Sequence, residues 1–162
     1  MEEDDWGQVL FIDARHAESV MADCAAIRLV HSSRGPNGSF AGCHVISTPD
    51  DISERRISFV SLVDMLEVPS SLVPVRFWNG LLDDTLLALR ADSATWLLRL
   101  REDETVTYLG LDLSGLNSIK LRDWQRILGW AQSNGLLFVD FRAAMILEPG
   151  SVRLSDYLDW LK

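Results

Sequence analysis

The sequence predicts an α/β fold in which helices pack on a mixed or mainly parallel sheet. Between Thr105 and Arg142, apolar residues recur first at every second position, then at every third or fourth, and finally form an unbroken run. These patterns are typical of a strand, an amphipathic helix and a strand buried on both faces. Two strands joined by one helix predict a right-handed parallel crossover.

The first strand is predicted at Gln8 to Asp13, where an apolar run follows an acidic start. A helix is predicted from Ala14 to Val30, because its apolar residues fall at helical spacing. Those residues are Ala17, Val20, Met21, Cys24 and Ile27. Ser32 to Ser39 is rich in Gly and Ser and predicts a loop.

The next segments are short. Cys43 to Ile46 and Ile57 to Leu62 carry β-branched and other apolar residues and predict two strands. Val63 to Leu66 predicts a short helix, which ends before Pro69 because proline interrupts helices.

The longest periodic segment allows two interpretations. From Leu81 to Arg101 no Gly or Pro interrupts apolar residues spaced by three and four, which predicts one long helix that could break at Asp92-Ser93. Alternatively, the helix ends at Arg90 and Thr95 to Arg101 is a strand. Glu102-Asp103-Glu104 would then turn a hairpin into the strand that begins at Val106.

In the core segment, Leu109 and Leu111 lie on one face of the predicted strand. The helix begins near Leu121, with Asn117 or Ser118 as its cap, and Asn134-Gly135 ends it. A buried strand follows at Leu136 to Phe141, and after Pro149-Gly150 a closing helix is predicted from Leu154 to Leu161.

Composition limits the class of protein. The 162 residues predict a single α/β domain, 1–162, with a possible subdivision into 1–73 and 74–162. The net charge of −9 argues against nucleic-acid and anionic membrane partners and suits capture of a basic protein. Since no apolar run is long enough to span a bilayer and the start is acidic, we expect a cytosolic protein.

Part of the chain resembles a known family. Asn79-Gly80-Leu81-Leu82-Asp83 and the run from Leu111 to Ile119, with the long-helix interpretation, resemble the STAS domain of anti-sigma-factor antagonists over about Val75 to Phe141. The resemblance implies a docking surface for a partner protein. Where that family usually shows Asp-Ser-Ser-Gly, this chain has Lys120-Leu121-Arg122-Asp123, so phosphorylation at that place is not expected.

Catalytic and metal-binding motifs are not found in the sequence. His16, His31 and His44 show no metal-ligand spacing, and no GxSxG is present. Cys24 and Cys43 are predicted to be buried free thiols. We therefore expect neither a cofactor nor a metal.

Our first hypothesis is a non-enzymatic protein that docks another, basic protein. An inhibitor, an immunity protein, a secretion chaperone and a regulatory scaffold all fit this class. Trp130 lies beside the apolar stripe of its helix and is a candidate interface anchor. The polar residues proposed around it are Asp123, Arg126, Asp83 and Asp84.

The second hypothesis is a small enzyme or ligand-binding protein. Asp13 and Asp112 each come near the end of a predicted strand, where open α/β sheets bind ligands. Together with the loop from Arg34 to Gly38 they could form a site for acid-base chemistry.

Overall fold

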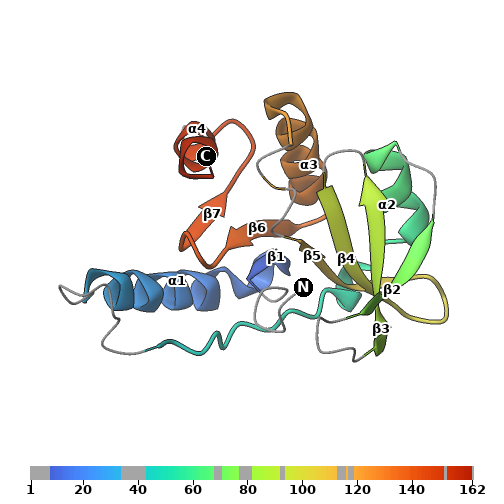
Figure 1. Ribbon diagram of the computed structural model, residues 1–162, viewed down its shortest axis with the longest axis horizontal. Coiled ribbons are helices and arrows are strands. Elements are labelled where there is room, and N and C mark those ends of the chain that lie inside the picture. The colour runs from blue at the N-terminus through green and yellow to red at the C-terminus, as the bar shows by residue number, and fades with distance from the viewer. Residues whose placement is uncertain are drawn as a thin grey trace.

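The computed structural model describes residues 8–33, 43–67, 71–76, 82–91, 94–112, 116, 119–151 and 153–161. Within these residues, seven strands form one sheet in the order β2-β3-β4-β5-β1-β6-β7 (Figure 1). The strands are β1 (Val9–Asp13), β2 (Leu72–Arg76), β3 (Leu82–Ala91), β4 (Ala94–Leu100), β5 (Val106–Leu111), β6 (Leu136–Asp140) and β7 (Met145–Leu147). The α-helices are α1 (Ala17–Ser32), α2 (Phe59–Leu66), α3 (Leu121–Ser133) and α4 (Arg153–Trp160), and 3-10 turns span Ala14–His16 (η1) and Ser53–Arg55 (η2).

The prediction of a mixed or mainly parallel sheet is wrong, because every pair of neighbouring strands is antiparallel. The predicted strand, helix and strand do occur as β5, α3 and β6. However, β1 lies between β5 and β6, and its Leu10 is opposite Gly110 on one side and Val139 on the other. Since β1 is antiparallel to both, β5 and β6 run in the same direction without touching as a pair. Local periodicity cannot show that a strand distant in sequence occupies the position between them.

The long helix over 81–101 is also wrong. The structure has a hairpin of β3 and β4, in which Ala91 is opposite Ala94. The alternative interpretation was right about the strand at Thr95 to Arg101 and about the turn at 102–104. In this turn the Arg101 backbone N–H donates to the Thr105 carbonyl oxygen at 3.0 Å, and Glu104 has a positive φ of 60°. Both interpretations put a helix before Arg90, and that part is a strand. Leu86 and Leu89 contact opposite faces of the sheet, so their helical spacing was fortuitous.

At the N-terminal side, the strand and helix predictions are confirmed by β1 and α1. No strand is present at 43–46 among the described residues, and the strand predicted at 57–62 is wrong because α2 begins at Phe59. Ser58 caps this helix by accepting a hydrogen bond from the Ser61 backbone N–H at 3.2 Å. The helix predicted at 63–66 is the second half of α2. The loop at 32–39 lies outside the described residues beyond Ser33.

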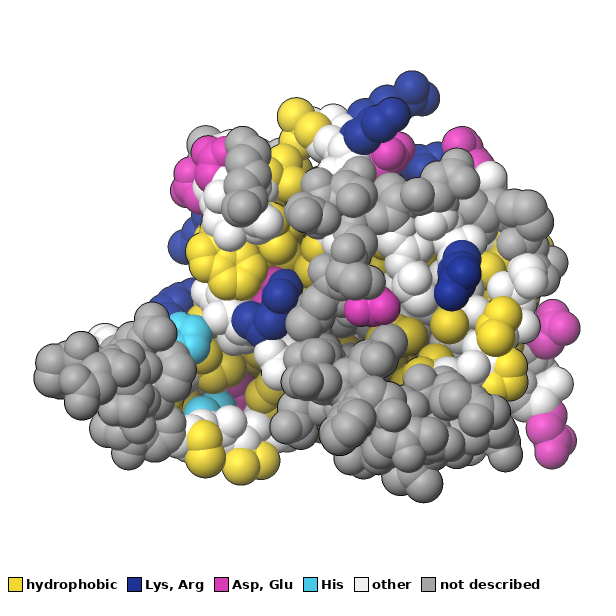
Figure 2. Space-filling model, in the orientation of Figure 1, with side chains coloured by type: hydrophobic (Ala, Val, Ile, Leu, Met, Phe, Trp, Pro, Cys, Tyr) yellow, Lys and Arg dark blue, Asp and Glu magenta, His cyan; other side chains and the backbone are white. Residues whose placement is uncertain are grey.

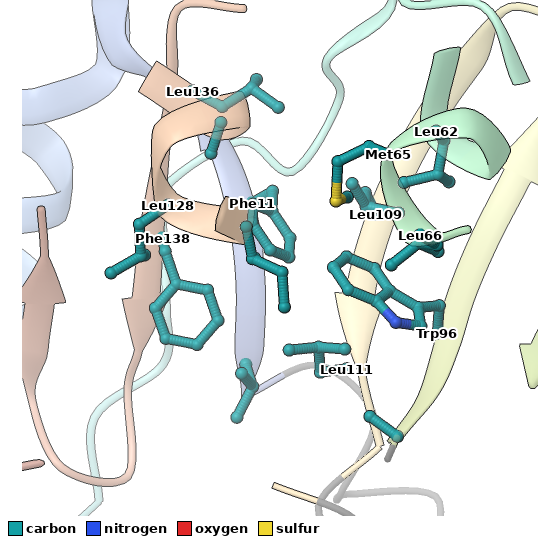
Figure 3. Packing of buried hydrophobic residues seen from close by; sticks show 14 of the residues in the cluster. Phe11, Leu62, Met65, Leu66, Trp96, Leu109, Leu111, Leu128, Leu136 and Phe138 are labelled. Atoms are coloured by element: carbon teal, nitrogen blue, oxygen red, sulfur yellow. The ribbon is translucent and has the colours of Figure 1, made fainter. Parts of the chain in front are cut away.

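Two hydrophobic cores hold the layers together. On one face of the sheet, α2, α3 and α4 cover Phe11, Trp96 and Phe138, while α1 covers the opposite face (Figure 1). Figure 3 shows the aromatic rings of the first core between α2 and α3, with Phe11 stacked on Trp96 at 5.4 Å between ring centroids. Because both faces are covered, the central strands are apolar throughout and show little alternation.

The remaining predictions concern the C-terminal half. The helix at Leu121 and the strand at Leu136 are confirmed, and α4 confirms the closing helix, while the short edge strand β7 was missed. The N-cap of α3 is Lys120, so neither Asn117 nor Ser118, which lie outside the described residues, occupies that position. The possible boundary between residues 73 and 74 falls inside β2, which pairs with β3.

Candidate functional site

Three of the five predicted partner-binding residues lie together on α3. Asp123, Arg126 and Trp130 are spaced by three and four residues, so they form one stripe along the helix. The stripe faces α2. The Arg126 guanidinium contacts the Glu67 carboxylate at 2.8 Å and the Asp123 carboxylate at 3.5 Å, and Trp130 Nε1 donates to Ser61 Oγ at 3.4 Å.

The α2 side of this face is equally polar. Leu62, Met65 and Leu66 turn toward the sheet, which leaves the other side of α2 to solvent. We call the resulting surface the α2-α3 face; its residues are Val60, Ser61, Asp64, Glu67, Asp123, Arg126 and Trp130. Val60 is 57% exposed, and Glu67 shows 76% of its side chain to solvent.

The face carries more acidic than basic side chains. The Arg126 guanidinium contacts two carboxylates, those of Glu67 and Asp123, and Asp64 adds an exposed carboxylate on α2. Figure 2 shows acidic and basic side chains next to one another over the upper ends of α2 and α3. Asp64 and Glu67 come at the C-terminal end of α2, where the helix dipole is negative and carboxylates destabilise the helix. Helix stability therefore does not explain their position.

Trp130 is less available than the sequence suggested. Its side chain is partly buried and packs against the main core, and its Nε1 donates to Ser61 of α2. It can contribute an apolar rim to an interface but does not project as a free anchor.

The two remaining predicted residues, Asp83 and Asp84, do not join this face. They begin β3, which β4, β5 and β1 separate from the strand β6 on which α3 packs. The structure describes only their backbone, and Asp83 is opposite Val75 of β2.

The second pair of candidates, Asp13 and Asp112, is not brought together. Leu10 is opposite Gly110 in the antiparallel neighbours β1 and β5, so Asp13 and Asp112 lie toward opposite ends of these strands, five residues apart along them. At about 3.4 Å for each residue, this separation is roughly 17 Å. The loop from Arg34 to Gly38 lies outside the described residues.

Asp13 instead serves a structural role at the end of β1. It is fully buried, and its carboxylate accepts hydrogen bonds from the side chains of Arg15 and Arg55 and from the Arg15 backbone. Burial by itself raises the pKa of Asp13, but these bonds and the charge of Arg55 outweigh it and hold the pKa well below its usual range. The guanidinium of Arg55 also lies against Gly135, which has a positive φ of 69° and stands between the end of α3 and the start of β6.

The structure contains a further buried carboxylate, Asp23, which was not predicted from the sequence. It lies on α1 and is 2% exposed. Its oxygens accept hydrogen bonds from His44 Nε2 at 2.7 Å, from both the backbone and hydroxyl of Ser47, and from both groups of Thr48. Asp23 therefore fastens the segment at 44–48 to α1. A charged residue on the apolar side of a helix, followed by a Ser-Thr pair after a loop, is the only signal in the sequence.

The prediction for the two cysteines has a mixed outcome. Cys24 is buried, but Cys43 is exposed, so the prediction that both are buried is wrong for Cys43. Burial raises the pKa of the Cys24 thiol, which is therefore neutral at pH 7. His44 is half-buried, and its Nε2 contacts the Asp23 carboxylate. Among the described residues no group of His, Cys, Asp and Glu is arranged to hold a metal ion.

The comparisons with known proteins add no family. No protein-family model matches the chain, and no curated protein or solved structure shows a significant match. They leave the resemblance to the STAS domain untested; the element order that carries it included the long helix, where the structure has β3 and β4. In the part of the chain that the structure describes, no helix has the length and apolar character needed to cross a bilayer.

Proposed function

We propose that this chain is a non-enzymatic protein-binding module of the cytosol that docks a basic partner on the α2-α3 face. The observation that carries the proposal is the pair of carboxylates, Glu67 and Asp123, on Arg126. The same two helices carry the exposed Val60 and the partly buried Trp130, which bonds to Ser61. Three residues predicted from the sequence, Asp123, Arg126 and Trp130, belong to this face.

The chemistry of the face favours a partner with lysines or arginines around a small apolar contact. Glu67 and Asp64 are exposed and can accept hydrogen bonds from basic side chains of a partner. Charges at the rim of an interface chiefly increase the rate of association and select the partner, whereas buried apolar contacts slow dissociation. Val60 and Trp130 would provide the apolar contact.

The alternative of a small enzyme receives no support from geometry. A pair of carboxylates can share acid-base work only when both contact the same substrate. Asp13 and Asp112 lie toward opposite ends of β1 and β5, and the Asp13 carboxylate is ion-paired with Arg15 and Arg55.

The test is affinity purification from the source cell with charge-reversed bait. Asp64→Lys combined with Asp123→Lys reverses two charges on the α2-α3 face, and Asp156→Lys combined with Glu18→Lys makes the same change on the exposed surfaces of α4 and α1. We expect a basic protein that the wild type and the control retain and the first variant loses.

The affinity of the reconstituted complex should then fall as the salt concentration is raised, because dissolved ions screen the attraction between the exposed charges of the two proteins. The proposal fails if the variant on the α2-α3 face retains every partner that the wild type retains, or if the retained partner is acidic.

A further inference from the structure

A second surface of the protein lies beside α1 and carries arginines. A groove of about 500 Å³ runs between α1 and the edge strand β7. It is lined by Met21, Cys24, Arg28, Ile146, Glu148, Ser151 and Arg153. In Figure 2, basic side chains lie beside hydrophobic ones in the region between α1 and α4. The volume is within the range of about 300 to 1,000 Å³ that is common for ligand sites.

Two arginines border the groove without an ion-pair partner among the described residues. Arg28 donates from Nη2 to the backbone oxygen of Ala144 at 2.6 Å, which holds its guanidinium beside β7. Arg153, at the start of α4, is exposed and makes no ion pair in the described part of the chain. By contrast, Arg15, Arg55, Arg126 and Arg142 each contact a carboxylate.

The charged side chains that line the groove are mainly basic, although the whole protein is acidic. Glu148 also lines the groove, so the count there is two guanidinium groups against one carboxylate, whereas the whole chain has a net charge of −9. An arginine can hold a carboxylate with two parallel hydrogen bonds, and Arg28 has donors left after its bond to Ala144. The charge favours an anionic group at this place.

The walls between these charges are apolar. Met21 is 54% exposed, the neutral thiol of Cys24 forms part of the floor, and Ile146 points to the same side of the sheet as α1. β7 is the last strand of the sheet, and no other strand among the described residues pairs with its outer edge. An open edge strand beside a helix is a known arrangement for binding an extended peptide as an added strand.

We propose that this groove binds an extended, acidic segment of another protein. The segment adds to the outer edge of β7, and the carboxylate of one Asp or Glu side chain is held between Arg28 and Arg153. Apolar side chains two positions before and after that residue contact Met21 and Ile146, because alternate residues of a strand point to the same side. This site is independent of the α2-α3 face, which selects basic partners.

Selection from a random heptapeptide phage library tests the proposal. The peptides are displayed at the N-terminus of the coat protein, so that none has a free C-terminal carboxylate and only side chains can supply the anion. We expect Asp or Glu to be enriched at one position between apolar residues. The proposal is overturned if the selected peptides are basic or show no acidic position.

Matched variants identify the arginines. Arg28→Gln with Arg153→Gln should weaken binding of the selected peptide at least tenfold, and so should replacing its acidic residue by the amide. Arg90→Gln with Arg122→Gln removes the same charge from exposed positions on β3 and α3 and should leave binding unchanged. Equal losses in both variants, or none in the first, would overturn the assignment.

Hydrogen exchange tests the added strand. Peptide binding should slow exchange of backbone amides within Met145–Leu147, since a strand added to β7 takes up its outward N–H groups. If binding leaves all three amides unchanged, the segment does not lie along β7 and the proposal is overturned.

Discussion

Replacement of Asp23 by alanine should cause a large loss of stability. The change leaves the backbone N–H groups of Ser47 and Thr48, which bond to the Asp23 carboxylate at 3.1 and 2.9 Å, without their acceptor. Breaking a buried charged network in this way costs about 3 to 5 kcal/mol. For a protein of this size that corresponds to a fall in Tm of roughly 6 to 20 °C. Asp23→Asn should lose less, because its remaining oxygen can still accept from Thr48.

The dependence on pH has a definite sign. Burial raises the pKa of Asp23, but hydrogen bonds from Thr48, His44 and Ser47 outweigh it and hold the pKa well below its usual range. Since the unfolded chain then binds protons more readily, Asp23 stabilises the fold above its unfolded pKa of about 3.9, and this contribution falls as pH decreases below it. Between pH 7 and pH 3 the wild type should lose about 1.3 kcal/mol through this residue.

Urea unfolding at pH 7 and pH 3, followed by circular dichroism and tryptophan fluorescence, measures both effects. The gap between wild type and Asp23→Ala should narrow by about 1.3 kcal/mol at pH 3, because the variant has no group to protonate there. Asp64→Ala, at an exposed position on α2, should change stability by less than about 0.5 kcal/mol at either pH. A gap that is small at pH 7, or constant between the two pH values, would refute the reasoning.

Two further predictions concern packing. Phe138→Ala should cost about 3 to 5 kcal/mol in urea unfolding, because its ring contacts those of Phe11 and Trp124 at 5.2 and 5.1 Å between centroids; a loss below 1 kcal/mol would contradict the packing. Gly135→Ala should lower the free energy of unfolding by about 2 kcal/mol, since φ is 69° and a Cβ would lie 2.6 Å from Arg55 Nη1. Gly129→Ala on α3 should raise it by roughly 0.5 to 1 kcal/mol, because no atom lies within 4 Å of the added Cβ. Equal changes of the two variants in melting experiments would contradict this contrast.

Secondary structure could be predicted from the sequence where one face of an element is exposed to solvent. α3 has a polar side of Arg122 and Gln125 opposite its buried Trp124 and Ile127, so its period was visible. The strands β3 and β4 are covered on both sides, and their leucines therefore follow no period of two. In such a run, leucines fall at helical spacing by chance. Because the run contains no Gly or Pro, the residues that usually mark a turn between two strands are also missing.

The candidate site could be foreseen in part for a similar reason. Asp123, Arg126 and Trp130 share one helix, so their common face follows from spacing alone. The partner helix α2, with Glu67 and Ser61, and the attachment of Asp23 to Thr48 depend on contacts between segments distant in sequence. Strand direction also separates Asp13 from Asp112, because the carboxyl ends of two antiparallel neighbours lie at opposite ends of the pair.

The position of β1 has a consequence for biosynthesis. β1 is made before its neighbours, yet it is hydrogen-bonded between β5 and β6, which leave the ribosome much later. Until β6 emerges, one side of β1 has unpaired backbone groups that can join a foreign strand. Ribosomes stalled after β5 should therefore hold a nascent chain with greater need of chaperones than those stalled after α4.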